Sequence, residues 1–185
     1  LPCGGKVYVE GMDTQDEACL LEIRRRVGMV FQNPDNQIIG TVVEEDVGFG
    51  PENLGVPTKE IWKRVEDSLR AVGMLDRRKD SPNKLSGGQK QRLCIARALT
   101  VEPKVLLLDE PCSALDVKAS AKIEELLKNL KERYTIVIVP HNLAQAKRIA
   151  DDVAFFQNGR LVETKDAETF WKKPECEETK EFLKG

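Results

Sequence analysis

The feature that most constrains this chain is a glycine-rich segment followed, after a short interval, by an apolar segment that ends in two acids. Residues 85–89 read Leu-Ser-Gly-Gly-Gln, and residues 105–110 read Val-Leu-Leu-Leu-Asp-Glu. The first is typical of a loop that opens onto a helix, where backbone N–H groups attract anions. The second is typical of a strand in a parallel sheet, because it is apolar without alternation. A site for a nucleoside triphosphate requires a loop that binds phosphate and an acid that binds a metal ion. We therefore expect an α/β protein that binds a nucleoside triphosphate.

A phosphate-binding loop of the form G-x-x-x-x-G-K-[ST] is expected before both segments, and residues 1–185 contain none. Gly4-Gly5-Lys6 is the nearest approach, but no position is left for the first glycine, and Val7 stands where a magnesium-binding hydroxyl is expected. The sequence begins at Leu1 without a methionine. We therefore expect an internal start or a truncated product that carries the later half of a nucleotide site.

Composition limits the function classes. The chain has 185 residues, enough for one domain with a small subdomain, and its net charge of −2 gives nucleic-acid binding no support. No apolar run approaches the roughly 18 residues of a membrane span. The five cysteines form no C-x-x-C pair and the chain has one histidine, so a zinc site is not indicated.

The apolar segments 105–108 and 135–139 are predicted to be strands buried on both faces of a parallel sheet. Residues 41–97 are mostly helical in pattern and are predicted to form a separate helical subdomain. The predicted α/β portions are therefore 1–40 and 98–185.

Local signals add two finer predictions. A helix is expected over residues 41–49, with Thr41 as its N-cap and an irregular connection from Pro51 onward. A hairpin is expected over residues 153–164, because Asn158-Gly159 suits a type I′ turn.

Two acids stand at the end of the first apolar strand. One of the two carboxylates, Asp109 or Glu110, could hold Mg²⁺, usually through water, and the other could polarise an attacking water. A structural interpretation is also open, in which the pair caps the following turn. The sequence alone leaves both interpretations standing.

Other candidates carry a similar ambiguity. Ser86, Gly87 and Gly88 offer a hydroxyl and unhindered N–H groups to an anion, but Ser-Gly-Gly is also an ordinary helix cap. Gln32 and His141 each follow a predicted strand and could orient water, metal or phosphate, although a structural role is open for both. The carboxylate of Asp116 closes a turn and could simply cap the next helix.

Together these residues resemble the ATP-binding cassette (ABC) ATPases, the motor subunits of ABC transporters. Gln32 matches the Q-loop, Leu85–Gln89 the signature motif and Val105–Glu110 the Walker B strand. Ser113–Asp116 match the D-loop, and His141 matches the switch histidine. The five motifs occur in the family order and cover nearly the whole chain.

The resemblance implies an α/β fold of the P-loop NTPase type: a mostly parallel sheet flanked by helices, with a helical subdomain, and here without the amino-terminal strands and the Walker A loop. It implies ATP and Mg²⁺ as cofactors. Its implied catalytic residues are Glu110, His141 and Gln32, and its implied metal-binding residues are Asp109 and Gln32. The implied nucleotide-binding residues are Ser86, Gly87, Gly88, Gln89 and Asp116.

The resemblance also implies partners. Two such domains pair head to tail as a homo- or heterodimer, with ATP between the phosphate-binding loop of one and the signature loop of the other. Integral membrane permease subunits, and no nucleic acid, are expected, with the chain peripheral to the cytoplasmic face of a prokaryotic plasma membrane. The region between Gln32 and the signature usually contacts the membrane subunit. Lacking its own phosphate-binding loop, the chain alone is expected to bind ATP weakly and to hydrolyse it negligibly.

Two subfamilies are visible. Arg24–Gly55 look like the energy-coupling-factor ATPases that drive cobalt and vitamin uptake. Leu93–Leu99, Asp109–Asp116 and Tyr134–Val139 look like phosphate-importer ATPases. The sequence therefore reads as a mosaic joined near Ser86–Arg92, and the solute is phosphate or cobalt and vitamins.

Three other interpretations remain open. The chain could be a non-catalytic module that donates only its signature loop to an intact partner, or a fragment that folds imperfectly and exposes strand edges. A soluble ABC-type ATPase of DNA repair or translation is disfavoured, because the sequence has no coiled-coil insertion and no basic patch.

Pro140 departs from the family pattern, since it precedes His141 at a position where a hydroxyl-bearing or small residue is usual.

Overall fold

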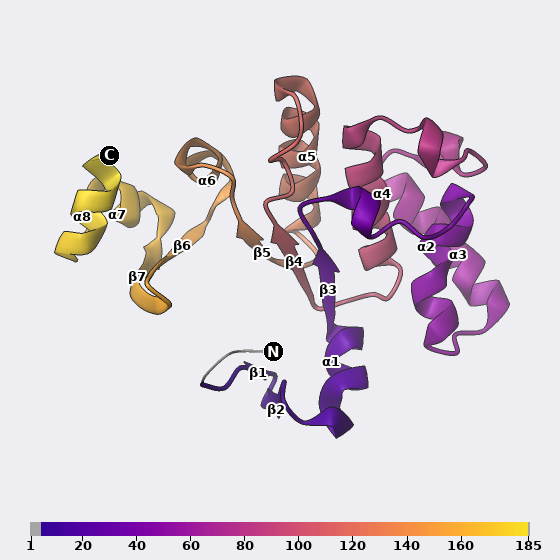
Figure 1. The fold of residues 1–185 in the computed structure, drawn as a ribbon, viewed down its shortest axis with the longest axis horizontal. Coiled ribbons are helices and arrows are strands. Elements are labelled where there is room, and N and C mark those ends of the chain that lie inside the picture. Colours follow the sequence, from indigo (N-terminus) through magenta and orange to yellow (C-terminus); the bar gives the residue numbers. More distant parts are fainter. Residues whose placement is uncertain (1–4, 185) are drawn as a thin grey trace. The chain divides into compact units, whose positions relative to one another are not determined.

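The computed structural model describes residues 5–184, so the Gly4-Gly5-Lys6 segment lies partly outside the described residues. The chain divides into two compact units, the first ending at Val139 and the second beginning at Pro140 (Figure 1). The predicted helical subdomain, residues 41–97, lies within the first unit, and its division from the α/β portions stays a prediction. Helix α4 (Gly87–Leu99) contacts strand β3 (Val27–Val30) within this unit.

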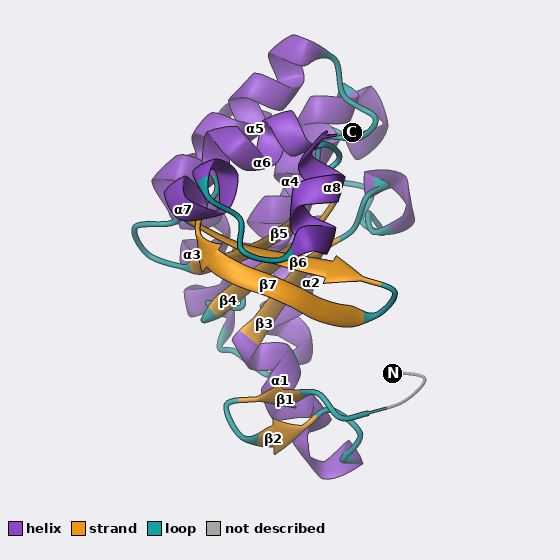
Figure 2. Ribbon diagram, turned by 90° about the vertical axis from the view of Figure 1, so that its left-hand side faces the viewer, coloured by secondary structure: helices purple, strands orange, loops and turns teal. Residues whose placement is uncertain are grey.

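Three parallel strands organise the first unit. Strand β4 (Val105–Asp109) lies between β3 and β5 (Thr135–Val139), with Val30 paired to Leu108 and Asp109 paired to Val139 (Figure 2). Because the strands are parallel, their carboxyl ends meet at one edge of the sheet. The segments that follow β3 and β4 therefore begin at the same edge, as the motif spacing predicts.

The two faces of this sheet differ in burial. Val30, Leu106 and Leu108 are fully buried on one face. On the other face Met29 and Val137 retain about half of their exposure, at 47% and 46%. The prediction that both strands are buried on both faces is therefore wrong for β5, whose residues are exposed or intermediate, and holds for one face of β4. An apolar sequence indicates that the side chains of a strand prefer to be buried. It does not show whether another element covers that face of the sheet.

Helices follow from apolar periodicity. Residues Ile61, Val65 and Leu69 repeat every fourth position of α3 (Thr58–Ala71) and are buried. Helices α2 (Val43–Asn53), α3 and α4 pack against one another, as Figure 1 shows. The remaining elements of this unit are β1 (Tyr8–Val9), β2 (Met12–Asp13), α1 (Leu20–Arg26), α5 (Val117–Leu130) and the short 3₁₀ helices η1 (Glu17–Cys19), η2 (Pro34–Asn36), η3 (Leu75–Arg77) and η4 (Pro82–Lys84).

Helix α2 corrects two local predictions. Thr41 is not its N-cap; Val42 is, and the N–H groups of Val43 and Glu44 donate to the carbonyls of residues 80 and 78. The helix also continues through Pro51 to Asn53. Proline cannot donate to the carbonyl four residues earlier, which is that of Val47. The Thr100 hydroxyl donates to this carbonyl instead, at 3.0 Å, so the bond that proline removes is replaced from outside the helix.

The second unit contains a hairpin and three helices. Strands β6 (Asp152–Gln157) and β7 (Arg160–Asp166) are antiparallel and are joined through Asn158 and Gly159, whose φ angles are +50° and +75°. The predicted hairpin is thus confirmed, with positive φ at both central residues as a type I′ turn requires. The helices are α6 (Leu143–Ile149), α7 (Ala167–Lys172) and α8 (Glu177–Lys184).

Candidate functional site

Two predicted site residues meet at the carboxyl edge of the sheet. Gln32 lies two positions after β3, and Glu110 directly follows β4. The Gln32 Nε2 donates a hydrogen bond to Glu110 Oε2 at 2.9 Å. Asp109, the last residue of β4, is exposed at the same edge. We call these three residues the acidic edge.

Glu110 is held in an uncommon backbone conformation. Its φ is +40°, in the left-handed region that costs free energy for a residue with a Cβ. Its N–H donates to the carbonyl of Val139 at 2.9 Å, and its carbonyl accepts from the N–H of Ser113 at 3.1 Å. These bonds fix the direction in which the chain leaves β4, and with it the position of the carboxylate.

The donor set of the acidic edge suits Mg²⁺. This ion takes one or two carboxylates and fills its remaining positions with water and substrate phosphates. Asp109 and the amide oxygen of Gln32 would hold it, beside the Glu110 carboxylate. Among residues 5–184 no three His, Cys, Asp or Glu side chains converge into a metal cage of their own. The residues therefore fit a magnesium ion that arrives with a phosphate-bearing ligand.

The loop that carries Gln32 is held by helix α4. The Gln91 amide donates to the carbonyl of Phe31 at 3.3 Å, and Lys90 Nζ lies 2.6 Å from Asp35 Oδ1. Gln37 also accepts from the N–H of Phe31 at 2.8 Å. Sequence reasoning missed these supports. The available signal was the pair Lys90-Gln91 directly after the glycine-rich loop, on the helix that this loop begins.

The glycine-rich loop forms the amino end of α4. Ser86 is the N-cap: its Oγ accepts from the N–H of Gln89 at 3.4 Å, and the Gln89 Oε1 accepts from the N–H of Ser86 at 2.8 Å. This is a capping box. The interpretation of Ser-Gly-Gly as a helix cap is therefore confirmed, with Ser86 as the N-cap. The side chain of Gln89 also takes part in this cap.

Gly88 also has a packing role. A Cβ on Gly88 would lie 2.9 Å from the Ala119 Cβ, closer than carbon atoms approach. A Cβ on Gly87 would lie 3.4 Å from a methyl of Leu115. Glycine therefore lets the amino ends of α4 and α5 touch, in addition to exposing N–H groups.

Asp116 caps helix α5. Its Oδ1 accepts from the N–H of Ala119 at 2.8 Å, as the structural interpretation of this residue predicts. It also lines a pocket of about 340 Å³ that contains Ser86, Gly88 and Gln89. The structure thus gathers four of the predicted nucleotide-binding residues in one place. Neither Gln32 nor Glu110 lines this pocket.

Three cationic side chains share this pocket and were missed by sequence reasoning. They are Arg92 from α4, and Lys118 and Lys122 from α5. We call this set, with Ser86 and Gly88, the cationic pocket. The available signal was the four-residue spacing of the two lysines, which places them on one face of a helix.

His141 belongs to the second unit, whereas Gln32 and Glu110 belong to the first. Its N–H donates to the Gln145 side chain at 3.2 Å, just before α6, and Asn142 caps that helix by accepting from the N–H of Gln145. Its membership of a common site with Gln32 and Glu110 stays a prediction.

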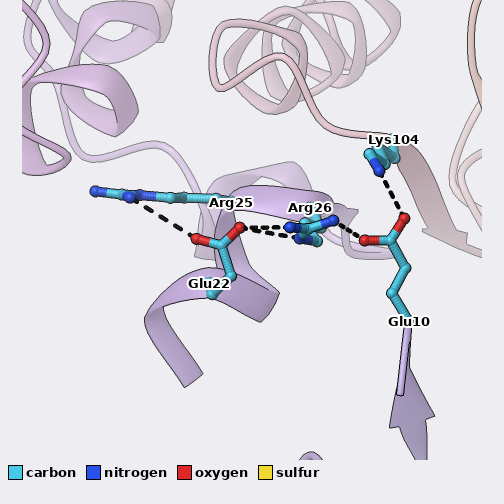
Figure 3. Close-up of polar contacts among 5 residues, drawn as sticks. All are labelled: Glu10, Glu22, Arg25, Arg26 and Lys104. Carbon is cyan, nitrogen blue, oxygen red and sulfur yellow. Dashed lines mark hydrogen bonds and ion pairs between the residues drawn. The ribbon is translucent and has the colours of Figure 1, made fainter. Parts of the chain in front are cut away.

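A second hollow lies at the opposite, amino edge of the sheet. It has a volume of about 580 Å³ and is lined by Arg26, Val56, Glu60, Arg64, Glu102 and Lys104 among others. Figure 3 shows the ion pairs beside it: Glu10 accepts from Arg26 and from Lys104, the latter at 2.7 Å, and Glu22 lies between Arg25 and Arg26. We call this hollow the charged groove.

The helices formed by residues 5–184 include none with the length and apolar character of a membrane span.

The parallel sheet with an acidic edge, joined to a capped Leu-Ser-Gly-Gly-Gln loop, defines a nucleotide-binding α/β protein. A family model described as ABC transporter matches residues 1–113, and the chain belongs to this family. The predicted fold class is confirmed by the solved structure of cbiO1 from Clostridium perfringens, described as part of the ABC transporter complex cbiONQ. That structure aligns with a TM-score of 0.82 and 34% identity, over 94% of this chain and 70% of that one.

Two relatives represent the two subfamilies that the sequence resembles. The energy-coupling factor transporter ATP-binding protein EcfA1 of Clostridium perfringens is 51% identical over 164 residues, 88% of this chain and 58% of the relative. The phosphate import ATP-binding protein PstB of Thermotoga maritima is 49% identical over 187 residues, 98% of this chain and 74% of the relative. Each match extends across most of the chain, and the chain spans 58% of the length of EcfA1.

Proposed function

We propose that this chain is the ATP-binding part of an ABC importer, in which ATP binding and hydrolysis are coupled to solute uptake. The observation that carries the proposal is the 2.9 Å hydrogen bond between Gln32 and Glu110 at the carboxyl edge of the sheet. The contact joins residues from two strands that are distant in sequence. It supports the proposed role of the Glu110 carboxylate as a general base toward water.

The residues of the acidic edge have distinct tasks in this proposal. Glu110 orients the attacking water and accepts its proton, while the Gln32 amide fixes the rotamer of that carboxylate. Asp109 lies on the metal side. Bound Mg²⁺ would neutralise charge that develops on the transferred phosphate. His141 is proposed to contact the terminal phosphate, as the resemblance to the switch histidine implies.

The glycine-rich loop is proposed to serve a second subunit. In a head-to-tail dimer, Ser86, Gly87, Gly88, Gln89 and Asp116 face the ATP that the partner holds. The capping box supports this role, because it fixes the loop at the amino end of α4, where N–H groups without an intrahelical partner favour an anion. The partner is a second ABC ATPase, either a copy of this chain or a different subunit.

The 185-residue chain by itself is proposed to bind ATP weakly and to turn it over negligibly, because its sequence contains no G-x-x-x-x-G-K-[ST] motif. Lys and hydroxyl groups of that motif supply the grip on the β- and γ-phosphates and on magnesium. ATPase assays on the purified chain test this point. Turnover that disappears in Glu110→Gln would contradict it.

The membrane partner is proposed to dock at the charged groove. The groove is lined by both acidic and basic side chains, and the Arg64 Nη2 lies 2.9 Å from the Glu102 Oε2. The apolar side chain of Val56 also lines it. A polar helix end or loop of a permease subunit suits such a surface. Docking there is consistent with the proposed location of the chain at the cytoplasmic face of a prokaryotic plasma membrane. The name of PstB supports phosphate as the solute, and the alternative of cobalt and vitamins rests on the resemblance of Arg24–Gly55 to the energy-coupling-factor ATPases.

A pull-down from a bacterial membrane extract tests the transport role, with the tagged chain as bait, with and without ATP, and mass spectrometry as readout. Recovery of importer membrane subunits is expected, and their identity decides between the solutes. A charge-reversed groove variant, Arg64→Glu, is the matched control and should lose these subunits. Recovery of chaperones alone from the wild-type chain would contradict the proposal.

A second candidate function is a non-catalytic module that donates only the signature loop to an intact ATPase. The observation that favours it is the fully formed cap of α4 in a chain without a phosphate-binding loop. A stable complex with a full-length ABC ATPase, whose turnover survives Glu110→Gln but not a change at Ser86, would support this candidate over the first.

A further inference from the structure

The side chain of Gln37 continues the hydrogen bonding of the parallel sheet at the point where β3 ends. Within residues 5–184, β3 is an edge strand, with β4 on one side and no strand on the other. On that other side, Gln37 Nε2 donates to the carbonyl of Met29 at 3.2 Å, and Gln37 Oε1 accepts from the N–H of Phe31 at 2.8 Å. A residue of a parallel neighbouring strand bonds to its partner strand in the same way. One side-chain amide therefore takes the place of a neighbouring strand.

Both polar backbone groups of Phe31 have side-chain partners. Its N–H donates to Gln37, and its carbonyl accepts from the Nε2 of Gln91 on α4 at 3.3 Å. Because each peptide unit is planar, these two bonds fix the orientation of the peptide units before and after Phe31. Packing of the Phe31 side chain does not provide this order, since that side chain is 46% exposed. The two hydrogen bonds therefore set the direction in which the chain enters Gln32.

Gln37 is itself anchored by its backbone. Its carbonyl accepts from Arg97 Nη1 of α4, and its N–H donates to the first carbonyl of η2 at 3.0 Å. The Arg97 guanidinium lies 5.6 Å from the centroid of the Phe49 ring on α2. The backbone and the side chain of Gln37 are thus both held, and together they close the loop 32–36, whose first residue is Gln32.

We propose that Gln37 is a positioning residue for Gln32 and, through Gln32, for the carboxylate of Glu110. The inference rests on the proposed function insofar as Glu110 acts on water. Gln37 fixes the backbone of Phe31, and the next side chain along the chain then places its Nε2 2.9 Å from Glu110 Oε2. An amide suits this task because it offers both a donor and an acceptor to the edge of a strand, whereas a carboxylate offers acceptors alone.

NMR of the isotopically labelled 185-residue chain tests the proposal, with the side-chain amide signal of Gln32 as the probe. In the wild type, Glu110→Gln should shift this signal, because the acceptor of its hydrogen bond changes from a carboxylate to a neutral amide. In Gln37→Leu the signal should already lie near that of a solvent-exposed glutamine. Adding Glu110→Gln to Gln37→Leu should then produce no further shift.

Two further variants separate positioning from a general loss of stability. Val65→Ala removes buried apolar volume from α3 and should lower stability while keeping the full response of Gln32 to Glu110→Gln. Gln37→Glu keeps an acceptor for the Phe31 N–H but loses the donor to the Met29 carbonyl, so its response should be reduced. This variant also serves if Gln37→Leu does not fold. A full response in either Gln37 variant, or an equal loss in Val65→Ala, would overturn the proposal.

The NMR probe requires no ATP, second subunit or permease. A failed membrane pull-down would therefore contradict the proposed function and leave the role of Gln37 standing. In an assembly that includes a phosphate-binding loop and turns over ATP, Gln37→Leu should lower kcat by up to about 10²-fold and leave KM near its wild-type value. The reason is that a misplaced carboxylate slows the chemical step without removing a contact to ATP. A raised KM at unchanged kcat would overturn the positioning role.

Discussion

The acidic edge and the cationic pocket carry opposite charges and depend on different conditions. The acidic edge presents Asp109 and Glu110, which repel a triphosphate unless a divalent cation lies between them. The cationic pocket has an excess of positive charge, and its lysines are exposed and therefore screened by salt. In the proposed function, water activation belongs to the acidic edge, and contact with phosphate belongs to the glycine-rich loop that borders the cationic pocket. The first should follow magnesium concentration and the second should follow ionic strength.

The largest expected effect breaks the acidic edge. In an assembly whose nucleotide site includes a phosphate-binding loop, Glu110→Gln should lower ATP turnover by about 10²–10⁴-fold, because a positioned general base is lost. Steady-state phosphate release measures this turnover. Glu125→Gln, on the exposed face of α5, is the control, and a Glu110→Gln assembly with normal turnover would contradict the assignment.

The next largest effect is expected from a substitution that adds a Cβ to a glycine of the cationic pocket. Gly88→Ala should lower the free energy of unfolding by about 1–3 kcal/mol, because the new Cβ would meet Ala119 at 2.9 Å. Adding Ala119→Gly should restore most of this loss. Urea denaturation measures both.

A second glycine provides the control for this substitution. Gly48 in α2 has room for a Cβ, with the nearest atom at 3.5 Å. Gly48→Ala should raise the free energy of unfolding by about 0.5–1 kcal/mol, because alanine favours the helix. Equal losses at both glycines would show that Gly88 is not a packing requirement.

A smaller effect compares the two helix caps that border the cationic pocket. Asp116→Ala should cost about 1 kcal/mol of stability, since its carboxylate accepts from the N–H of Ala119 at 2.8 Å. Ser86→Ala should cost less, because the corresponding bond to Gln89 is 3.4 Å long and the Gln89 half of the cap survives. Thermal unfolding of the two variants ranks them, and the reverse order would show that the Ser86 hydroxyl dominates the cap.

The smallest expected effect concerns Glu163, a carboxylate that belongs to neither the acidic edge nor the cationic pocket. Glu163 on β7 accepts from the N–H groups of Glu175 and Cys176, at 2.9 and 3.2 Å, just before α8. The bond from Glu175 is the main reason that the pKa of Glu163 lies below its usual value near 4.5, and Lys165 adds to the effect.

Because the folded-state pKa of Glu163 is lowered, its contribution to stability is present above the unfolded-state pKa and is lost as the pH falls through the folded-state value. The protection factor of the Cys176 amide, which is the intrinsic exchange rate divided by the observed rate, should therefore fall in acid for the wild type. In Glu163→Gln this protection factor should be low already at neutral pH and change little with pH. A wild-type protection factor that stayed constant as the pH fell would contradict the assignment.

Local features of the fold could be predicted from sequence, and distant ones could not. The Ser86 cap and the Asn158-Gly159 turn depend on residues within a few positions of one another. The passage of α2 through Pro51 depends on Thr100, whose hydroxyl reaches a carbonyl 53 residues earlier in the chain. No residue near Pro51 in the sequence indicates that the Thr100 hydroxyl donates to this carbonyl.

The candidate site shows the same division with one exception. The meeting of Gln32 and Glu110, 78 residues apart, could be anticipated because parallel strands bring their carboxyl ends to one edge. The contribution of Lys118 and Lys122 could not, since it requires knowing that α5 lies against α4. The half-exposed face of β5 was likewise hidden, because apolar residues look alike whether or not a neighbour covers them.

The contact between Gly88 and Ala119 has a mechanical consequence. Two helices separated by flexible side chains can shift slightly against each other, but here no side chain of α4 intervenes, and a Cβ on Gly88 would already lie 2.9 Å from the Ala119 Cβ. A displacement of the segment that ends at Asp116 would therefore reach the amino end of α4 through closely packed atoms rather than through a flexible side chain.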